Sequence, residues 1–315
     1  MFELSKWIWM NGKIVPWDQA TVHVSAHALH YGTAFFDSMR CYETDKGPII
    51  FRPKDHVARL YASAAAYGAK IPFDPLEVES ACAEVVRRNH FNSCYIRPLC
   101  YFGSATLGVH PRVPKIELVI LAFPWDPFLK KQGEESGIRV TISPWRRFHY
   151  DMMPTTSKAS GGYLNSVLAV MDAVKRGFTE AILLNQEGNV AEGSGENVFI
   201  VKNNKLITND EHSSILLGIT RDTVIQLAHK FGLEISVQAI SKEALFSADE
   251  AFFTGTAAEI VPIREIDEKV IGSGSPGPIT QRLQQTYTDI IHGRLPEYRE
   301  WLYPVGTSAT PSTRH

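Results

Sequence analysis

Residues 155–163 read Thr-Thr-Ser-Lys-Ala-Ser-Gly-Gly-Tyr, and they place Lys158 at the entrance to an amphipathic helical segment. The apolar side chains of that segment recur at helical spacing: Leu164, Val167, Leu168, Met171 and Val174. Gly177 follows as a helix-stop signal. A lysine by itself is usually solvated, so the rest of the chain must decide whether Lys158 is chemically active.

A carboxylate in a glycine-rich stretch offers Lys158 a partner. The stretch is Ala191-Glu192-Gly193-Ser194-Gly195-Glu196-Asn197, followed by a β-rich run. Pyridoxal phosphate enzymes need a lysine that bonds the cofactor and an acid that faces the pyridine nitrogen. Lys158 and Glu192 are therefore candidates for these two roles. The alternative is that Glu192 is an ordinary solvated turn carboxylate.

Two further segments suit an anion such as a phosphate. Gly218-Ile219-Thr220 begins a helical pattern, and a helix N-terminus offers unpaired N–H groups and a positive dipole. The alternative is a plain helix cap by Thr220. Thr254-Gly255-Thr256-Ala257-Ala258 is a turn of small residues, which lets backbone amides approach an anion closely. Its alternative is a tight strand-to-helix connection.

An arginine and a tyrosine share one side of a predicted strand. In Tyr95-Ile96-Arg97-Pro98, Tyr95 and Arg97 are two residues apart and suit a carboxylate ligand. An arginine on a solvated sheet face is the alternative. His27 and His30 have no carboxylate at metal-ligand spacing, so we expect packing roles and no metal site.

Composition bounds the class of protein. The chain has 315 residues, 44% hydrophobic residues and a net charge of -2, which argues against a nucleic-acid binder. Its four cysteines lack CxxC spacing and fit a reducing cytoplasm. No apolar run reaches the roughly 20 residues of a membrane span, and the N-terminus lacks signal-peptide features. We expect a cytoplasmic enzyme with no membrane partner.

Periodicity predicts α+β organisation. Asn11-Gly12 between apolar runs predicts a hairpin, and a second is expected at Asn203-Asn204. Helices are expected over 54–67, 75–90, 164–176, 221–231 and 278–293. Strands are expected over 95–102, 116–123, 138–143, 181–185 and 197–202, and the first two should pair in a sheet. No regular β-α-β alternation exists, which favours α+β over a doubly wound sheet. We expect a small N-terminal α/β domain over 1–124, an interdomain loop over 125–137, a larger C-terminal domain over 138–305 and a disordered tail over 306–315.

The order of these motifs closely resembles the fold-type IV pyridoxal phosphate enzymes, and specifically the branched-chain amino acid aminotransferases. The resemblance runs from about Trp7 to Leu302. Besides the stretches around Lys158, Glu192, Tyr95, Gly218 and Thr256, it includes His27-Ala28-Leu29-His30-Tyr31-Gly32. It implies a two-domain fold with the active site at the domain interface, and pyridoxal 5′-phosphate as cofactor.

The resemblance implies a role for each cofactor contact. Lys158 would bond the cofactor and move the proton at the substrate Cα. Glu192 would pair with the pyridine nitrogen, and Tyr163 would hydrogen-bond the ring hydroxyl. The phosphate would be bound by Arg59, Ile219, Thr220 and Thr256.

The resemblance also implies a substrate site and a partner. The substrate carboxylate would be held by Thr256, Ala257 and Ala258, with Tyr95 and Arg97 nearby. The side-chain pocket would include Phe36, Ser38, Trp125, Phe128 and Tyr163, while Tyr31 and Val109 would come from a second subunit of a homodimer or higher homo-oligomer. The reaction implied is ping-pong transfer of the amino group of leucine, isoleucine or valine to 2-oxoglutarate.

The chain departs from the family pattern near the pocket. Phe36-Asp37-Ser38-Met39-Arg40 replaces the usual Phe-Glu-Gly-Ile-Arg, and Phe128 replaces a frequent tyrosine. Arg146-Arg147-Phe148-His149 is an unusual approach to the lysine strand. These changes leave three alternatives open: a transaminase of (R)-amines or D-amino acids, a lyase resembling aminodeoxychorismate lyase, and a non-catalytic binding protein on the same scaffold. Side activity toward (R)-amines is also compatible with Ser38.

Overall fold

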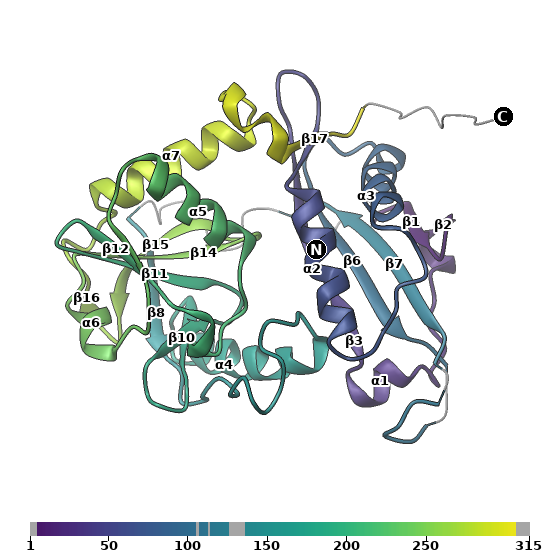
Figure 1. Ribbon diagram of the computed structural model, residues 1–315, viewed down its shortest axis with the longest axis horizontal. Coiled ribbons are helices and arrows are strands. Elements are labelled where there is room, and N and C mark those ends of the chain that lie inside the picture. Colours follow the sequence, from purple (N-terminus) through teal and green to yellow (C-terminus); the bar gives the residue numbers. More distant parts are fainter. Residues whose placement is uncertain (1–4, 105–106, 113, 126–135, 307–315) are drawn as a thin grey trace. The chain divides into compact units, whose positions relative to one another are not determined.

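A computed structural model describes residues 5–104, 107–112, 114–125 and 136–306 of the chain. It divides into two compact units. Unit 1 comprises Met1–Trp125 and Thr288–His315, and unit 2 comprises Asp126–Tyr287 (Figure 1). Each unit combines helices with its own β-sheet, so the predicted α+β class is confirmed.

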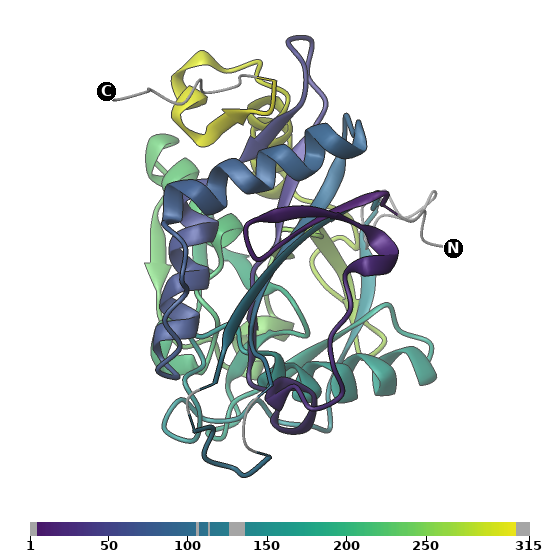
Figure 2. The ribbon, with the colours of Figure 1, turned by 90° about the vertical axis from the view of Figure 1, so that its right-hand side faces the viewer.

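Unit 1 is built on an antiparallel sheet in the order β17-β5-β4-β6-β7-β1-β2, with β3 also paired to β6. Helices α2 and α3 pack against each other and against this sheet (Figure 2). The bounds are β1 Trp7–Met10, β2 Lys13–Pro16, α1 His27–Tyr31, β3 Ala34–Phe36, β4 Met39–Tyr42, β5 Ile49–Phe51, α2 Pro53–Ala65, α3 Pro75–Asn89, β6 Cys94–Phe102, β7 Ile116–Phe123 and β17 Leu302–Pro304.

Local sequence signals explain several of these elements. Asn11 and Gly12 have φ of 50° and 86°, which a two-residue hairpin turn between β1 and β2 requires. Helix α3 begins at Pro75 after Asp74, whose side chain accepts a hydrogen bond from the N–H of Leu76. Strands β6 and β7 pair from Tyr95–Phe123 to Phe102–Ile116. The predicted hairpin, helices and strand pair are confirmed here.

The four cysteines of the chain all lie in unit 1 and are buried with free thiols: Cys41, Cys82, Cys94 and Cys100. Burial raises the pKa of the Cys82 thiol, and it raises the pKa of the Cys100 thiol to about 12. Such thiols stay protonated at neutral pH and are poor nucleophiles.

Unit 2 contains a mixed sheet in the order β10-β9-β8-β15-β14-β11-β12-β13, with β16 paired to β15. The pairs β8–β9, β8–β15 and β12–β13 are parallel. The bounds are β8 Ile138–Ile142, α4 Tyr163–Lys175, β9 Glu180–Leu184, β10 Val190–Gly193, β11 Asn197–Lys202, β12 Lys205–Thr208, α5 Ile219–Lys230, β13 Ile235–Val237, α6 Lys242–Phe246, β14 Glu250–Gly255, β15 Glu259–Ile266, β16 Lys269–Val270 and α7 Pro278–Ile291.

The predicted apolar face of α4 lies on the surface. Five of its side chains are 45–69% exposed: Leu164, Val167, Leu168, Met171 and Val174. The helix packs against β9 through small residues instead, chiefly Ala169 and Ala173 against Ala181 and Leu183. Periodicity located the helix and the stripe, while the alanines on the other side permit the closer approach to the sheet.

The C-terminal residues join unit 1, whereas the sequence pattern favoured placing residues up to 305 in the C-terminal domain. Leu302 pairs with Phe51, Tyr303 with Ile50, and Pro304 with Ile49, so β17 forms an edge of the first sheet. The expected loop over 125–137 falls largely, and the expected tail almost wholly, outside the described residues. Among the described helices, none is long and apolar enough to cross a membrane.

Candidate active site

Lys158 is buried in unit 2 and contacts the first residue of α4. Its Nζ donates a hydrogen bond to the Tyr163 hydroxyl at 2.6 Å, and Lys158 is only 9% exposed. Gly162 packs closely beside them, because a Cβ there would lie only 3.1 Å from the Phe148 ring. The Gly-Gly-Tyr sequence therefore allows close packing that sets Tyr163 against the amine. A solvated surface lysine, the usual case, is excluded.

Glu192 lies on β10, not in a turn, and is 7% exposed. Its Oε1 forms an ion pair with Arg147 Nε at 2.9 Å, and its Oε2 accepts a hydrogen bond from the N–H of Leu216 at 2.9 Å. Burial raises the pKa of Glu192, while Arg147, the Leu216 N–H and Lys158 oppose that rise. A further cation placed against Glu192 would favour its ionised form still more.

A second buried carboxyl, Glu196, has acidic neighbours and, among the described residues, no ion pair with an arginine. Burial raises the pKa of Glu196 well above its usual range, and neighbouring Glu180 and Glu192 raise it further. Glu196 Oε2 accepts a hydrogen bond from the N–H of Gly195. Glu192, with an arginine in contact, is therefore the better of the two at holding a negative charge opposite a ring nitrogen.

The residue before α5, Gly218, is tightly packed. No side chain caps the helix. A Cβ on Gly218 would lie 2.1 Å from Asn197 Oδ1, and the Asn197 amide donates to the carbonyl of Leu216 at 2.8 Å. Thr220 lies within the first turn and is 3% exposed, so the alternative of a cap by Thr220 is wrong. The helix end suits an anion.

Gly218→Ala tests this packing. Because Asn197 is buried and held by Leu216, we expect the added methyl to lower the free energy of unfolding by roughly 1–3 kcal/mol, as overpacking does, and to weaken phosphate-ester binding. Urea unfolding and cofactor titration measure the two effects. Gly195→Ala is the matched control, since a Cβ there meets nothing within 4 Å. Equal effects of both variants would contradict the role of Gly218.

The small-residue turn connects two strands. It joins β14 to β15, so the alternative of a strand-to-helix connection is wrong. Thr256 and Ala257 are half-buried, and Ala258 is 1% exposed. A Cβ on Gly255 would lie 3.3 Å from the carbonyl oxygen of Gly195, which brings this turn against the glycine-rich stretch after Glu192.

In unit 1 three of the predicted substrate residues form an aromatic group around Arg97. The guanidinium carbon of Arg97 lies 4.6 Å from the centre of the Phe36 ring and 5.3 Å from that of Tyr95. Tyr95 in turn stacks on Trp125 at 5.2 Å between ring centres. Tyr95 and Arg97 thus face the same side of β6, as predicted, and Arg97 is not simply solvated.

Arg59 and Ser38 lie nearby in the same unit. Arg59 is held by the buried carboxylate of Asp37, with Nε at 2.8 Å from Oδ2 and Nη2 at 2.8 Å from Oδ1. Ser38 is 2% exposed, and among the described residues its hydroxyl has no hydrogen-bond partner. The extra hydroxyl at this position is therefore buried and unsatisfied, which is costly.

The residues expected from a second subunit are exposed. Tyr31 is 42% exposed, its hydroxyl donates to the carbonyl of Leu107 at 3.0 Å, and its ring stacks on His27 at 4.5 Å. Val109 is 82% exposed. His27 is buried and hydrogen-bonds Thr33 and Gly108, the packing role predicted for it. Phe128 lies outside the described residues.

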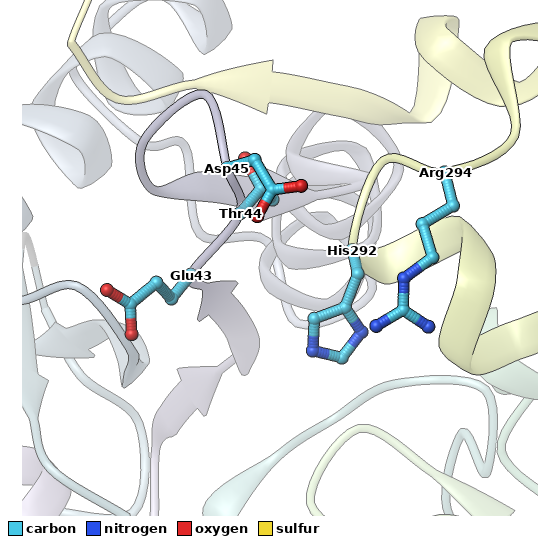
Figure 3. Close-up of a pocket in the computed structure, with 5 residues that line it drawn as sticks. All are labelled: Glu43, Thr44, Asp45, His292 and Arg294. Atoms are coloured by element: carbon cyan, nitrogen blue, oxygen red, sulfur yellow. The ribbon is translucent and has the colours of Figure 1, made fainter.

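A pocket elsewhere in unit 1 shares none of these residues. It is lined by side chains of the β4–β5 loop and of the segment after α7: Glu43, Thr44, Asp45, His292 and Arg294 (Figure 3). It mixes both signs of charge and contains no predicted site residue. We assign it no part in the chemistry.

Sequence reasoning missed three partners in the site. Arg147 was noticed only in the unusual stretch before the lysine segment, and Asp37 and Asn197 only as parts of motifs. Each acts on a residue far from it in sequence. A carboxylate that is buried requires a cationic partner, which was the only sequence-level reason to expect these contacts. The sequence does not indicate which arginine is that partner.

The two-unit α+β fold, with lysine, tyrosine and a buried acid gathered in one unit, defines an enzyme of fold type IV. The sequence profile of the family "Amino-transferase class IV" matches residues 34–266. The Escherichia coli K12 branched-chain-amino-acid aminotransferase is 42% identical over 300 residues, covering 95% of this chain and 97% of that protein.

Solved structures agree with the sequence relatives. The T.th. branched-chain amino acid aminotransferase complexed with N-(5′-phosphopyridoxyl)-L-glutamate is 46% identical, with a TM-score of 0.92 over 96% of this chain and 99% of that one. Its complex with 4-methylvaleric acid gives a TM-score of 0.90 at the same identity and coverage. The chain belongs to the class IV aminotransferases and, among them, to the branched-chain amino acid aminotransferases.

Proposed function

We propose that this aminotransferase uses pyridoxal 5′-phosphate to move the amino group of leucine, isoleucine or valine to 2-oxoglutarate in two ping-pong half-reactions. The observation that carries the proposal is the buried Lys158–Tyr163 contact, in the same unit as the buried Glu192–Arg147 ion pair. Relatives named for this activity, and a neighbour complexed with a phosphopyridoxyl-glutamate, support it.

The residues of unit 2 fit the cofactor. When bound, pyridoxal phosphate supplies an electron sink for a substrate that loses its Cα proton. Lys158 Nζ anchors the cofactor and then moves that proton, while Tyr163 holds the amine in position. Glu192 is the acid that faces the ring nitrogen, and the ion pair with Arg147 favours its ionised form against the effect of burial. The N-terminus of α5, which no side chain caps, binds the phosphate through Ile219 and Thr220 together with Thr256. Arg59 of unit 1 is assigned to the same phosphate because the resemblance to the family implies it.

We assign the substrate contacts to the aromatic group around Arg97 and to the small-residue turn. Thr256, Ala257 and Ala258 bind the α-carboxylate through a turn whose small side chains let a ligand come close to the backbone. Phe36, Tyr95 and Trp125 offer apolar surface to an aliphatic side chain, with Arg97 among them for the second carboxylate of glutamate or 2-oxoglutarate. One site can thus accept both substrates.

The enzyme acts as a homodimer in the cytoplasm. Tyr31 and Val109 of one protomer complete the substrate pocket of its partner, and both are exposed in the single chain. The exposed apolar stripe of α4 also suits an interaction surface, since monomeric proteins rarely expose large contiguous apolar patches. The four free buried thiols suit a reducing compartment.

A donor panel with 2-oxoglutarate as acceptor tests the proposal. We expect the highest kcat/KM with L-leucine, L-isoleucine and L-valine, and at least about 100-fold lower values with D-alanine and (R)-1-phenylethylamine, which lack the correctly placed carboxylate or configuration. Glutamate formation measured by a coupled assay gives the rates. Turnover of (R)-1-phenylethylamine above that of L-leucine, or pyruvate release without an acceptor, would contradict the proposed function.

A further inference from the structure

Asp37 is a buried carboxylate that accepts four hydrogen bonds. Its Oδ2 accepts from Arg59 Nε at 2.8 Å. Its Oδ1 accepts from Arg59 Nη2 at 2.8 Å, from His56 Nδ1 at 2.7 Å and from its neighbour Ser38 N at 2.6 Å. Asp37 is fully buried, and the side chains of His56 and Arg59 are 2% and 13% exposed. We call Asp37, His56 and Arg59 the Asp37 cluster.

The protonation of the Asp37 cluster is fixed at neutral pH. Burial alone would raise the pKa of Asp37, but the Arg59 guanidinium and the hydrogen bond from His56 hold it well below its usual value. Burial lowers the pKa of His56 and, with Arg59 and Arg52, outweighs the attraction of Asp37. His56 is therefore neutral, and its Nδ1 carries the proton, because an ionised carboxylate can only accept.

The cluster fixes the plane of the Arg59 guanidinium. Two parallel hydrogen bonds to one carboxylate hold a guanidinium in one plane and one rotamer. His56 and the Ser38 N–H also donate to Oδ1, and these two further bonds restrain the carboxylate against rotation with Arg59. The direction in which Nη1 points is thus set before any ligand arrives. An Arg59 side chain that is already oriented loses less conformational entropy when a ligand binds.

We propose that Asp37 is a positioning residue for the phosphate ester of the cofactor, acting through Arg59. The inference rests on the proposed function, in which Arg59 binds that phosphate. Asp37 touches neither cofactor nor substrate in this role. It aligns the arginine, and its charge keeps His56 and Arg59 in a single arrangement.

Titration of the cofactor-free full-length chain with pyridoxal phosphate and with pyridoxal tests the inference, because pyridoxal lacks the phosphate. We expect Asp37→Asn to weaken pyridoxal phosphate binding about tenfold, the effect of releasing one long side chain, and to leave pyridoxal binding unchanged. An asparagine places an N–H where Arg59 needs an acceptor. Asp37→Glu, which restores the carboxylate, should recover most of the affinity.

Matched variants separate positioning from a general structural effect. Glu79→Gln makes the same chemical change at another buried carboxyl of unit 1 and should leave both affinities unchanged. Arg59→Lys keeps the charge but cannot form the paired contact, and it should weaken pyridoxal phosphate binding by a similar factor. If Asp37→Asn does not fold, the comparison of pyridoxal phosphate with pyridoxal is made on Arg59→Lys instead. Combined with Asp37→Asn, Arg59→Lys should give no further loss, as expected for residues that act together.

Several results would overturn the inference. Equal losses of pyridoxal and pyridoxal phosphate affinity in Asp37→Asn would mean a merely structural role. Additive losses in the double variant would mean that Asp37 acts independently of Arg59. An unchanged phosphate-ester affinity in Arg59→Met would overturn the assignment of Arg59 itself, and with it the inference, while the donor panel would still stand as the separate test of the reaction.

Discussion

Lys158→Ala is expected to lower the rate of transamination between L-leucine and 2-oxoglutarate by about 10⁴-fold or more, since it removes both the covalent anchor and the group that moves the Cα proton. Lys158 is buried, and its Nζ is held by the hydrogen bond to the Tyr163 hydroxyl. Glutamate formation measures the rate, and the visible absorbance of the bound cofactor should shift because the covalent link is lost.

The control for this variant is another lysine on the adjoining helix. Lys175→Ala, in the exposed last turn of α4, should keep its absorbance and its rate. Far-ultraviolet circular dichroism should match wild type for both variants. If Lys158→Ala kept an unaltered cofactor spectrum and appreciable turnover, the assignment of Lys158 would be wrong.

Glu192→Gln is expected to reduce kcat by about 10²–10³-fold, the usual effect of removing one strong electrostatic contact from an active site. The glutamine side chain can still accept from the N–H of Leu216, so the fold should persist. The carboxylate that pairs with Arg147 is lost, however, and the ring nitrogen no longer has an anion opposite it. Steady-state kcat with saturating L-leucine measures the effect.

A nearby exposed carboxylate gives the comparison. Glu187→Gln changes a side chain that is 54% exposed and should leave kcat within about twofold, as expected for surface charges. The unfolding midpoint should change little in either variant. A Glu192→Gln enzyme with wild-type kcat would remove Glu192 from the catalytic group.

Local sequence signals predicted much of the fold. Asn11-Gly12 needs only the neighbouring residues to form a hairpin turn, and the predicted helices after Pro53 and Pro75 begin where proline favours the first turn. The pairing of β6 with β7 was also predicted, because both are long β-rich runs. The order of the motifs then indicated the family, which the similarity to known proteins confirms.

Contacts between distant residues could not be predicted in this way. The pairing of β17 with β5 joins residues 302–304 to residues 49–51, and periodicity within either segment does not predict it. The Arg147–Glu192 and Asp37–Arg59 contacts depend on which of several arginines the fold brings to a buried acid. The stripe on α4 was located correctly, but periodicity gives the direction of a face and not what covers it.

The four buried cysteines allow the local unfolding of unit 1 to be measured by thiol labelling. Unit 2 has no cysteine, and each thiol of unit 1 is at most 1% exposed. A thiol reagent added to the native enzyme therefore reacts only as fast as the first sheet and its helices open. The labelling rate measures the local stability of that unit separately from the unit that carries Lys158, so the effect of any substitution can be assigned to one half of the enzyme without adding a probe.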